Sequence, residues 1–278
     1  MARVLAWLMA GLAVAAAGAA GVRAEDQPLR FLRFLADGEP HYGYLIDDTI
    51  VELEGDFLHT REETGRFVPL EAVELLPPVV PSKVIGVALN YPLDGAAPPA
   101  GPPGLFAKLP SSVVAHGAAI VAPPDSTDLH FEGEVVVVIG SRARNISPDQ
   151  AAEVIFGVTA GNDVTERGYE PSPFNVLRIK AADTFAPLGP WVVPGLDYNA
   201  LRIRTRLNGE VVQDGTTARL IHSIDELVSF VSRYVTLEPG DVIYTGTPGP
   251  TRAMQPGDVV EVEVEGVGTL RNTVEAAP

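Results

Sequence analysis

Hydrophobic residues along the chain recur mainly in short alternating or β-branched runs, with turn residues between them. Between residues 29 and 53, the turn signals Asp37-Gly38-Glu39-Pro40 and Asp47-Asp48 separate such runs. We therefore expect strands over residues 29–35, 42–46 and 49–53, which form a small antiparallel meander. A polar stretch with some helical character follows.

Prolines then mark a boundary in the chain. Pro77, Pro78 and Pro81 lie in the otherwise apolar segment 75–81, where each removes a backbone donor and favours an extended path. This predicts a linker and places a domain boundary near Leu76. We expect a small N-terminal β domain over residues 25–76 and a larger domain over residues 77–278.

The larger domain has more strand signals than helix signals. Helices are indicated in only two places, after Ser147-Pro148-Asp149 and over residues 227–234, where Ser223 is the expected N-cap. Because strands and helices do not alternate as in βαβ folds, the expected class is mostly β with a few helices (α+β). The expected strands span residues 83–88, 104–108, 119–122, 129–139, 201–207, 241–245 and 259–265.

The first residues have the pattern of an export signal. Arg3 precedes an apolar stretch, residues 4–20, that has no ionisable group, and Val22-Arg23-Ala24 supplies small residues at positions −3 and −1. We expect a signal peptide over residues 1–24 and an exported protein, periplasmic or secreted. An uncleaved membrane anchor is the alternative, because the stretch nearly reaches the length that spans a bilayer. After cleavage no membrane partner is expected.

Composition excludes several classes of function. The 278 residues include no cysteine, which excludes disulfides, thiolate metal sites and a cysteine nucleophile. Asp and Glu number 36 against 20 Lys and Arg, for a formal net charge of −16. So acidic a chain is poorly suited to bind a phosphate backbone, and no nucleic-acid partner is expected.

Two closely spaced acids open one of the expected strands. Glu132 and Glu134 share a face by strand alternation, as does His130, and they run into the β-branched segment 135–139, which is typical of a strand buried on both faces. Buried carboxylates this close need a cation, and oxygen ligands suit Mg²⁺, Mn²⁺ or Ca²⁺. The alternative is an exposed strand face. From these residues alone both interpretations stay open, whereas an exposed face is favoured for the other alternating acids of the chain, Glu261, Glu263 and Glu265.

Three further residues extend the candidate site. Asp163 ends an apolar segment, where an acid is otherwise often a cap or turn residue. Lys180 could neutralise the acids or bind a substrate carboxylate, although an isolated lysine is more often a surface residue. Thr247 lies in a Thr-Gly-Thr-Pro turn whose hydroxyl and N–H groups could bind an anion.

These motifs, taken in order, resemble the fumarylacetoacetate hydrolase family. The likeness extends from about Leu29 onward and is nearest to the small bacterial acylpyruvase and isomerase/decarboxylase branch. The motifs are Gly86 to Tyr91, Phe106-Ala107-Lys108, Phe131 to Glu134, Asn162-Asp163, Lys180 to Trp191, Leu207 to Glu210, Leu237 to Ile243, and Thr245 to Pro248.

The resemblance implies a mixed β-roll catalytic domain, usually a homodimer, that acts on small 2-oxo or 1,3-dioxo acids such as acylpyruvates or fumarylacetoacetate-like compounds. It implies that Glu132, Glu134 and Asp163 hold a divalent metal, with Mg²⁺ first and Mn²⁺ or Ca²⁺ as alternatives. It further implies that Lys180 serves in catalysis and substrate binding, and that Thr247 binds the substrate.

The chain departs from the family pattern where hydrolytic members activate water. Those members carry a His shortly after the Asn-Tyr pair and a Glu one helical turn later, but here Asp94 and Ala97 stand at these positions. Glu170 stands where a substrate-contacting Gln is usual, and we expect it to contact the substrate. Asp94 is the first candidate for the catalytic base, and His130 is the second.

The function we expect is a metal-dependent hydrolase or lyase that acts on a C–C bond of a small oxo acid. Two alternatives stay open because the His and Glu are replaced. One is a 2-oxo acid decarboxylase or tautomerase that needs no activated water. The other is a non-catalytic protein that binds a metal or an oxo acid.

Overall fold

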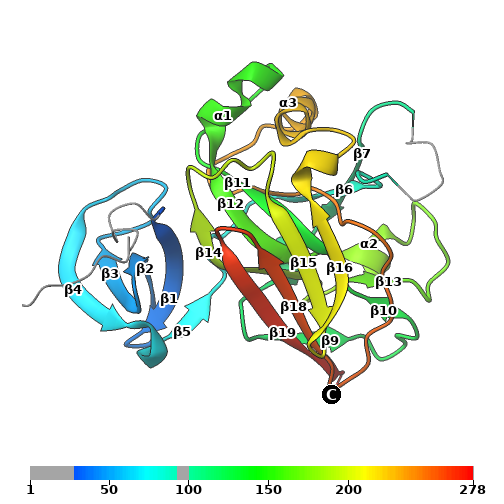
Figure 1. Ribbon diagram of the computed structural model, residues 1–278, viewed down its shortest axis with the longest axis horizontal. Coiled ribbons are helices and arrows are strands. Elements are labelled where there is room, and N and C mark those ends of the chain that lie inside the picture. Colours follow the sequence, from blue (N-terminus) through cyan, green and yellow to red (C-terminus); the bar gives the residue numbers. More distant parts are fainter. Residues whose placement is uncertain (1–27, 93–99, 278) are drawn as a thin grey trace, which may run out of the picture.

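The computed structural model describes residues 28–92 and 100–277, which form a small N-terminal body and a larger body (Figure 1). In the small body, β1 (Arg30–Ala36), β2 (Glu39–Ile46), β3 (Thr49–Leu53) and β4 (Glu63–Pro69) pair in that order, all antiparallel. The expected meander is therefore confirmed. The helical interpretation of the polar stretch after it is wrong, because residues 63–69 pair with the free edge of β3, and β5 (Glu74–Leu76) pairs with β1.

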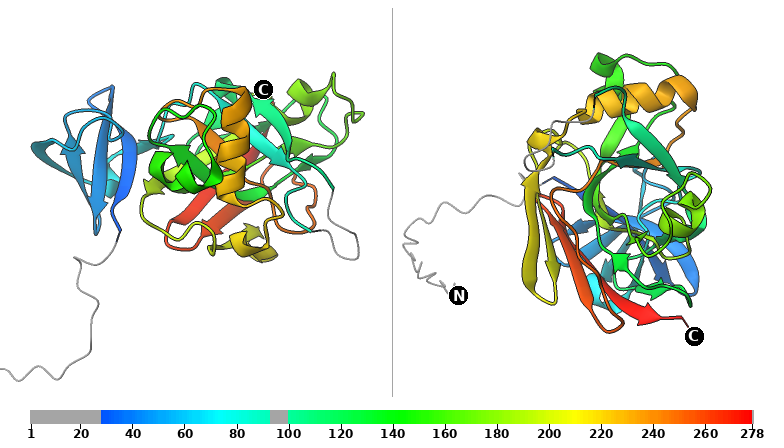
Figure 2. Two further views of the ribbon diagram at one scale, coloured as in Figure 1. Left: turned by 90° about the horizontal axis from the view of Figure 1, so that it is seen from above. Right: turned by 90° about the vertical axis from the view of Figure 1, so that its right-hand side faces the viewer.

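The small body stands beside the larger one and contacts it through β1 (Figure 2). Phe31 of β1 pairs with Val192, and its ring packs edge-on against Phe156 at a centroid distance of 5.4 Å. Phe57 packs against the same Phe156 ring at 5.3 Å. These aromatic contacts connect the cores of the two bodies. The boundary that we place near Leu76 stays a prediction.

Two β-sheets form the larger body. The first has the order β14-β12-β11-β17-β6-β7 and is mixed, because β17 and β6 are parallel while β11, β12 and β14 are antiparallel. The second has the order β16-β15-β18-β19-β9. The strands of the first sheet are β6 (Val84–Ala88), β7 (Gly104–Lys108), β11 (Gly133–Ile139), β12 (Ile155–Asn162), β14 (Ala186–Val193) and β17 (Val242–Tyr244). Those of the second are β9 (Ala119–Ala122), β15 (Arg202–Leu207), β16 (Glu210–Thr216), β18 (Val259–Val264) and β19 (Gly268–Ala276).

Short elements complete the body: the strands β8 (Val113–Val114), β10 (Leu129–His130) and β13 (Thr165–Glu166), and the helices α1 (Ala151–Val154), α2 (Val176–Lys180) and α3 (Ile224–Tyr234). The expected class, mostly β with a few helices, is confirmed. Ser223 caps α3 in a capping box with Glu226, as expected, whereas the helix after Ser147 is only one turn long. Among the described residues, no helix is long and apolar enough to cross a membrane.

The strand β11 lies at the centre of the molecule. All seven of its residues are buried, with Val135 and Val137 in the core cluster that includes α3 and the second sheet, and Val136 and Val138 in the cluster toward β1. A strand buried on both faces was expected here from its run of valines. It begins at Gly133, however, because the expected strand over 129–139 breaks between His130 and Gly133.

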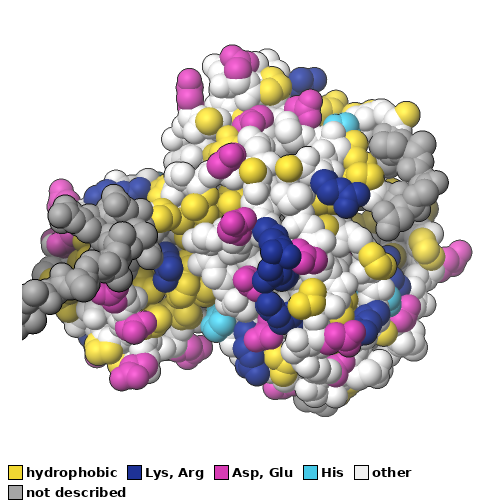
Figure 3. All heavy atoms as spheres, viewed as in Figure 1, with side chains coloured by type: hydrophobic (Ala, Val, Ile, Leu, Met, Phe, Trp, Pro, Cys, Tyr) yellow, Lys and Arg dark blue, Asp and Glu magenta, His cyan; other side chains and the backbone are white. Residues whose placement is uncertain are grey.

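The outer face of the second sheet carries paired charges. On β18 the valines after Val259 are buried, and Glu263 bonds to Arg206 at 2.6 Å while Glu261 lies 3.8 Å from Arg271. Figure 3 shows basic and acidic side chains interspersed over this face. The exposed-face interpretation of Glu261, Glu263 and Glu265 is thereby confirmed.

Gly161 of β12 is required by close packing at the heart of the first sheet. A Cβ atom there would lie 2.4 Å from Cγ2 of Val136 and 2.6 Å from Cε1 of Tyr244. We predict that Gly161→Ala lowers the free energy of unfolding by about 1–3 kcal/mol, because neither neighbour can move without disturbing the core.

Gly104→Ala in β7 is the matched control for urea denaturation. The nearest atom to a Cβ at Gly104 is the Cβ of Ala88, at an ordinary contact distance of 3.5 Å, so this variant should keep nearly all of its stability. Equal losses for the two variants would contradict the packing described for β12.

Candidate active site

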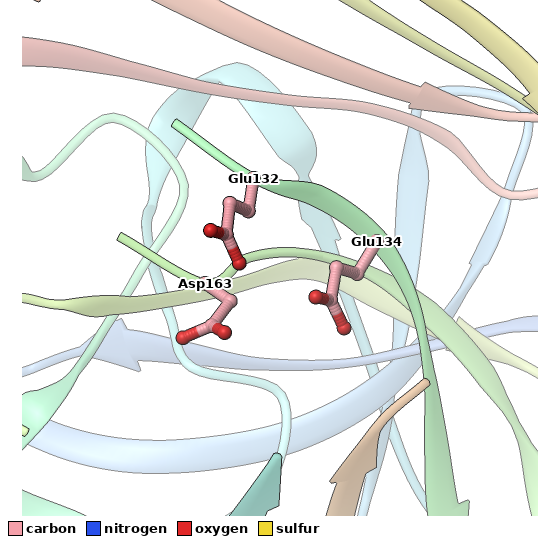
Figure 4. Close-up of side chains that lie close together, drawn as sticks. All are labelled: Glu132, Glu134 and Asp163. Atoms are coloured by element: carbon pink, nitrogen blue, oxygen red, sulfur yellow. The ribbon is translucent and has the colours of Figure 1, made fainter. Parts of the chain in front are cut away.

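Three carboxylates converge where β11 and β12 meet. Glu132 directly precedes β11, Glu134 lies within it, and Asp163 directly follows β12. The strands are antiparallel, and Gly133 pairs with Asn162, so the start of one strand lies beside the end of the other. One oxygen from each acid lies within 4.8 Å of the others, and the three side chains point into a common space (Figure 4).

Backbone hydrogen bonds hold this junction in place. The N–H of Asp163 donates to the carbonyl of Glu132 at 2.8 Å, and the N–H of Glu132 donates to Oδ1 of Asn162 at 2.9 Å. Because Asn162 is buried, these bonds are shielded from water. The positions of the first and third acid are thus fixed by the strand ends rather than by flexible loops.

Three cations contact two of the acids. Lys180 bridges Glu132 and Asp163, with Nζ to Oε2 at 2.7 Å and Nζ to Oδ2 at 2.5 Å. Lys108, which is 2% exposed, donates to the other oxygen of Asp163 at 2.5 Å, and Arg167 donates to Oε1 of Glu132 at 2.5 Å. These contacts offset the mutual repulsion of Glu132 and Asp163.

Glu134 has no such cation among the described residues. Its Oε2 accepts a hydrogen bond from the N–H of Gly246 at 2.7 Å. Complete burial, followed by the charges of Asp163 and Glu132, raises the pKa of Glu134 well above its ordinary value. Burial alone would also raise the pKa of Asp163, but Lys108 and Lys180 together lower it below its ordinary value. One member of the trio therefore lacks a compensating positive charge.

The donor set fits a hard divalent cation. All three ligands are carboxylates, and a separation within 4.8 Å allows one ion with oxygen ligands at about 2.0–2.6 Å. The site is also buried, so a bound cation would be poorly screened and would interact strongly with Glu134. The residues present therefore match the metal that the sequence led us to expect, while the identity of the ion stays open.

A Thr-Gly-Thr-Pro loop closes one side of the site. Gly246 has φ of 110°, and a Cβ there would lie 2.9 Å from the Cβ of Asn90, so this position requires glycine. The amide of Asn90 bonds in turn to the carbonyl of Thr245 at 2.9 Å. This packing directs the N–H of Gly246 at Glu134.

The hydroxyl of Thr247 is held by two partners. It donates to the carbonyl of Gly133 at 2.8 Å and accepts from Nε2 of Gln213 at 2.9 Å. Gln213 is buried on β16, so the second sheet contributes to the orientation of this loop. Thr247 also lines the cavity that contains the acids.

The acids open into a cavity of about 600 Å³, which is within the usual size of a small-molecule site. Glu132, Glu134, Asp163, Lys180 and Thr247 all line it. The structure thus brings together five residues that the sequence selected. Their individual roles stay predictions.

Other predicted site residues lie elsewhere. Asp94 lies outside the described residues. Glu170 is exposed and is not among the described residues that line the cavity. His130 is not among the described residues that line the cavity; the strand breaks after it, and its ring bonds to Asp128 at 3.0 Å and to Thr251 at 2.8 Å.

Lys108 and Arg167 contact the acids, and sequence reasoning assigned no role to either. Lys108 appeared only as a letter in a family motif at the end of an apolar strand. The position of a lysine at the end of an apolar strand is the sequence signal that could have identified Lys108. The homodimer also stays a prediction, since the structure describes a single chain.

Comparisons with known proteins extend these findings. Residues 83–275 match the family described as "Fumarylacetoacetate (FAA) hydrolase C-terminal", and residues 29–78 match "Rv2993c-like, N-terminal". An uncharacterised protein of Archaeoglobus fulgidus is 44% identical over 245 residues, which are 87% of this chain and 94% of that protein.

Several similar proteins carry functional names, among them isomerases, an isomerase/decarboxylase and hydrolases. The 4-hydroxyphenylacetate degradation bifunctional isomerase/decarboxylase of Escherichia coli is 36% identical over 265 residues, which are 92% of this chain and 58% of that longer protein. The solved structure of 5-carboxymethyl-2-hydroxymuconate delta-isomerase from Mycobacterium smegmatis has a TM-score of 0.84 and 37% identity, and the match covers 89% of this chain and all of that one.

The expectation of an export signal is wrong. Residues 1–27 lie outside the described residues, and the family matches begin at residue 29. Neither the relatives nor the structure gives evidence of a signal peptide or of a periplasmic protein. We therefore make no proposal of export.

The resemblance seen in the motifs is confirmed by these matches. The catalytic-domain match alone covers more than half of the chain, and the carboxylates, Lys180 and the Thr-Gly-Thr-Pro loop all lie within it. The chain belongs to the fumarylacetoacetate hydrolase family.

Proposed function

We propose that this protein is a divalent-metal-dependent isomerase or decarboxylase of small 2-oxo acids. The observation that carries the proposal is the buried trio Glu132, Glu134 and Asp163, which opens into a cavity together with Lys180. The functional names of two relatives support the reaction type. The metal is expected to be Mg²⁺, with Mn²⁺ or Ca²⁺ as alternatives.

A divalent ion held by the three carboxylates would supply a Lewis acid that polarises the substrate carbonyl. Burial alone would lower the pKa of Lys180, but Asp163 and Glu132 raise it above its ordinary value, so its ammonium group stays charged. That group can bind a substrate carboxylate or an oxygen that becomes negative during the reaction. Thr247 lines the same cavity, and we propose that it contacts the substrate; its hydroxyl would have to exchange its bond to the carbonyl of Gly133 to donate to an anion.

The residues that would activate water in hydrolytic members are replaced. Asp94 and Ala97 stand where the family resemblance calls for His and Glu, and the described lining of the cavity includes no histidine. Decarboxylation of a carboxylate β to the 2-oxo group needs no such base: the C–C bond to that carboxylate breaks, CO₂ leaves, the electron pair is delocalised into the carbonyl as an enolate, and the carbon then takes a proton from solvent. Isomerisation moves one proton between two carbons, so it needs a group that accepts and returns that proton, but it needs no activated water. These reactions therefore suit the site better than hydrolysis.

The proposal predicts that loss of one carboxylate weakens metal binding. Glu134→Gln should weaken the affinity for Mn²⁺ by at least roughly 10–100-fold, as measured by titration calorimetry. Loss of a residue that only orients a metal ligand already costs this much, and Glu134 is proposed to be a ligand itself. Because burial already raises the pKa of Glu134, this isosteric change should leave the metal-free fold intact.

Glu261→Gln on β18 is the matched control, since Glu261 is a partly exposed acid outside the cavity. Its affinity for Mn²⁺ should equal that of the unchanged protein. Unchanged affinity in Glu132→Gln, Glu134→Gln and Asp163→Asn alike would rule out the ligand assignment.

The proposal also predicts a metal-dependent reaction. Purified protein with Mg²⁺ should release CO₂ from oxaloacetate or shift the enol–keto absorbance of an acylpyruvate, and EDTA should abolish this. Lys180→Gln should lower kcat/KM by about 100-fold or more, the usual effect of removing one donor to a developing anion.

Arg178→Gln, an exposed neighbour on α2, should leave kcat/KM unchanged. Release of pyruvate from an acylpyruvate would instead indicate C–C hydrolysis, the reaction first expected from the family. Metal-dependent binding of oxo acids without turnover would indicate the non-catalytic alternative. Either result would refute the proposed reaction.

A further inference from the structure

A second cavity lies where the small body meets the second sheet of the larger body. Its volume is about 450 Å³, within the usual range of a small-molecule site, and its described lining shares no residue with that of the metal cavity. The lining includes Arg30 of β1, Trp191 of β14, and Arg202 and Arg204 of β15, together with the turn between β18 and β19. We propose that this cavity binds a small aromatic carboxylate, which the guanidinium groups of Arg30 and Arg204 hold at its charged end and Trp191 contacts at its ring.

Arg30 lines the cavity without an acidic partner among the described residues. Its guanidinium lies 5.3 Å from the centre of the Trp191 ring, a favourable position for a cation over an aromatic face. Contact with a ring leaves N–H donors of the guanidinium to other partners. Arg30 can therefore donate to an anion in the cavity while it stays over Trp191.

Arg204 is a second cation that is only weakly paired. Its side chain is 27% exposed, and the acids nearest to it, Asp214 and Glu263, lie 3.5 and 3.6 Å away. Asp214 bonds more closely to Arg202, at 2.6 Å. Glu263 bonds more closely to Arg206, also at 2.6 Å. A carboxylate in the cavity would give Arg204 the close, charge-assisted hydrogen bonds that these acids make with its neighbours.

The indole ring of Trp191 is fixed in place beside these cations. Its Nε1 donates to the carbonyl of Val267, in the turn between β18 and β19, so the polar edge of the ring has a partner. The backbone of Gly268 packs close to the ring, because a Cβ there would lie 3.2 Å from Cζ2. A fixed aromatic surface favours an aryl group over an alkyl group, since paired aromatic rings gain free energy beyond the area they bury.

Two acids also line the cavity, and each already has a partner. Oε2 of Glu265 accepts the backbone N–H of Arg202 at 3.0 Å, and Oε2 of Glu263 accepts from Arg206. The described lining thus carries three arginines against two glutamates, in a chain whose formal net charge is −16. This local excess of positive charge favours an anionic ligand, and the glutamates limit its strength.

Titration with benzoate, followed by the fluorescence of Trp191, tests the proposal. The chain has two tryptophans, so Trp7→Phe leaves Trp191 as the only one in the full-length protein. EDTA and a constant ionic strength exclude effects of metal and of general screening. Benzoate should change the fluorescence in a saturable way. Benzamide, the neutral analogue, should bind at least about tenfold more weakly, and cyclohexanecarboxylate, which lacks the aromatic ring, about threefold or more weakly.

Variants of the lining locate the effect. Arg30→Gln and Arg204→Gln should each lower the affinity for benzoate by about tenfold or more, because each removes a charged donor. Arg252→Gln is the matched control, since it removes the same charge from an arginine outside the lining and should leave the affinity unchanged. Glu263→Gln should raise the affinity by about twofold or more, a gain that a folding defect cannot produce.

Lys180→Gln should leave the affinity for benzoate unchanged, which excludes binding in the metal cavity. Unchanged affinity in both Arg30→Gln and Arg204→Gln, or loss of affinity in Lys180→Gln, would overturn the proposal. So would an affinity for benzamide, cyclohexanecarboxylate or inorganic phosphate that equals the affinity for benzoate. Because these measurements need neither a metal nor turnover, their outcome does not depend on the proposed function.

Discussion

The repulsion among three buried carboxylates is the constraint around which the rest of this site is arranged. Glu132, Glu134 and Asp163 come within 4.8 Å of one another in the interior, where charges are costly to bury. Lys108, Lys180 and Arg167 compensate Glu132 and Asp163, but they leave Glu134 with only a backbone N–H. A divalent cation resolves this imbalance, and it would also supply the chemistry that 2-oxo acids require.

The fold holds the three acids close together, despite their repulsion, by placing them at the ends of rigid strands. The antiparallel pairing of β11 with β12 brings Glu134 opposite Gly161 and sets Asp163 beside Glu132. Tyr244 of β17 packs over Gly161, and the loop that follows β17 directs the N–H of Gly246 at Glu134. The second sheet contributes Gln213, which orients Thr247. Four strands from two sheets thus determine the geometry of one small cavity.

Much of this site could be predicted from local sequence pattern. The run of valines after Glu134 predicted a buried strand, and the alternating Glu261, Glu263 and Glu265 predicted an exposed one. Both predictions hold because the period of a strand is set by the backbone alone. Local pattern alone could not predict that the three acids form one site, because Asp163 and Glu132 lie far apart in sequence. That prediction depended on the resemblance of the ordered motifs to a known family.

The features missed by sequence reasoning depend on tertiary contacts. Strand β14 contains Pro187, Gly189 and Pro190, which are usual signs of a loop, and it pairs nonetheless with β12. His130 was expected on the same strand face as the acids, but the alternation of side chains between the two faces does not continue across the break before Gly133. The burial of Lys108 follows only from its ion pair with Asp163, which lies 55 residues away in sequence.

The central claim is that the three carboxylates form a metal site, and a crystal structure of the protein with Mn²⁺, measured at the manganese absorption edge, tests it most directly. The account predicts one anomalous peak in contact with oxygens of Glu132, Glu134 and Asp163. Absence of that peak at saturating Mn²⁺, with Lys180 still bridging Glu132 and Asp163, would contradict it.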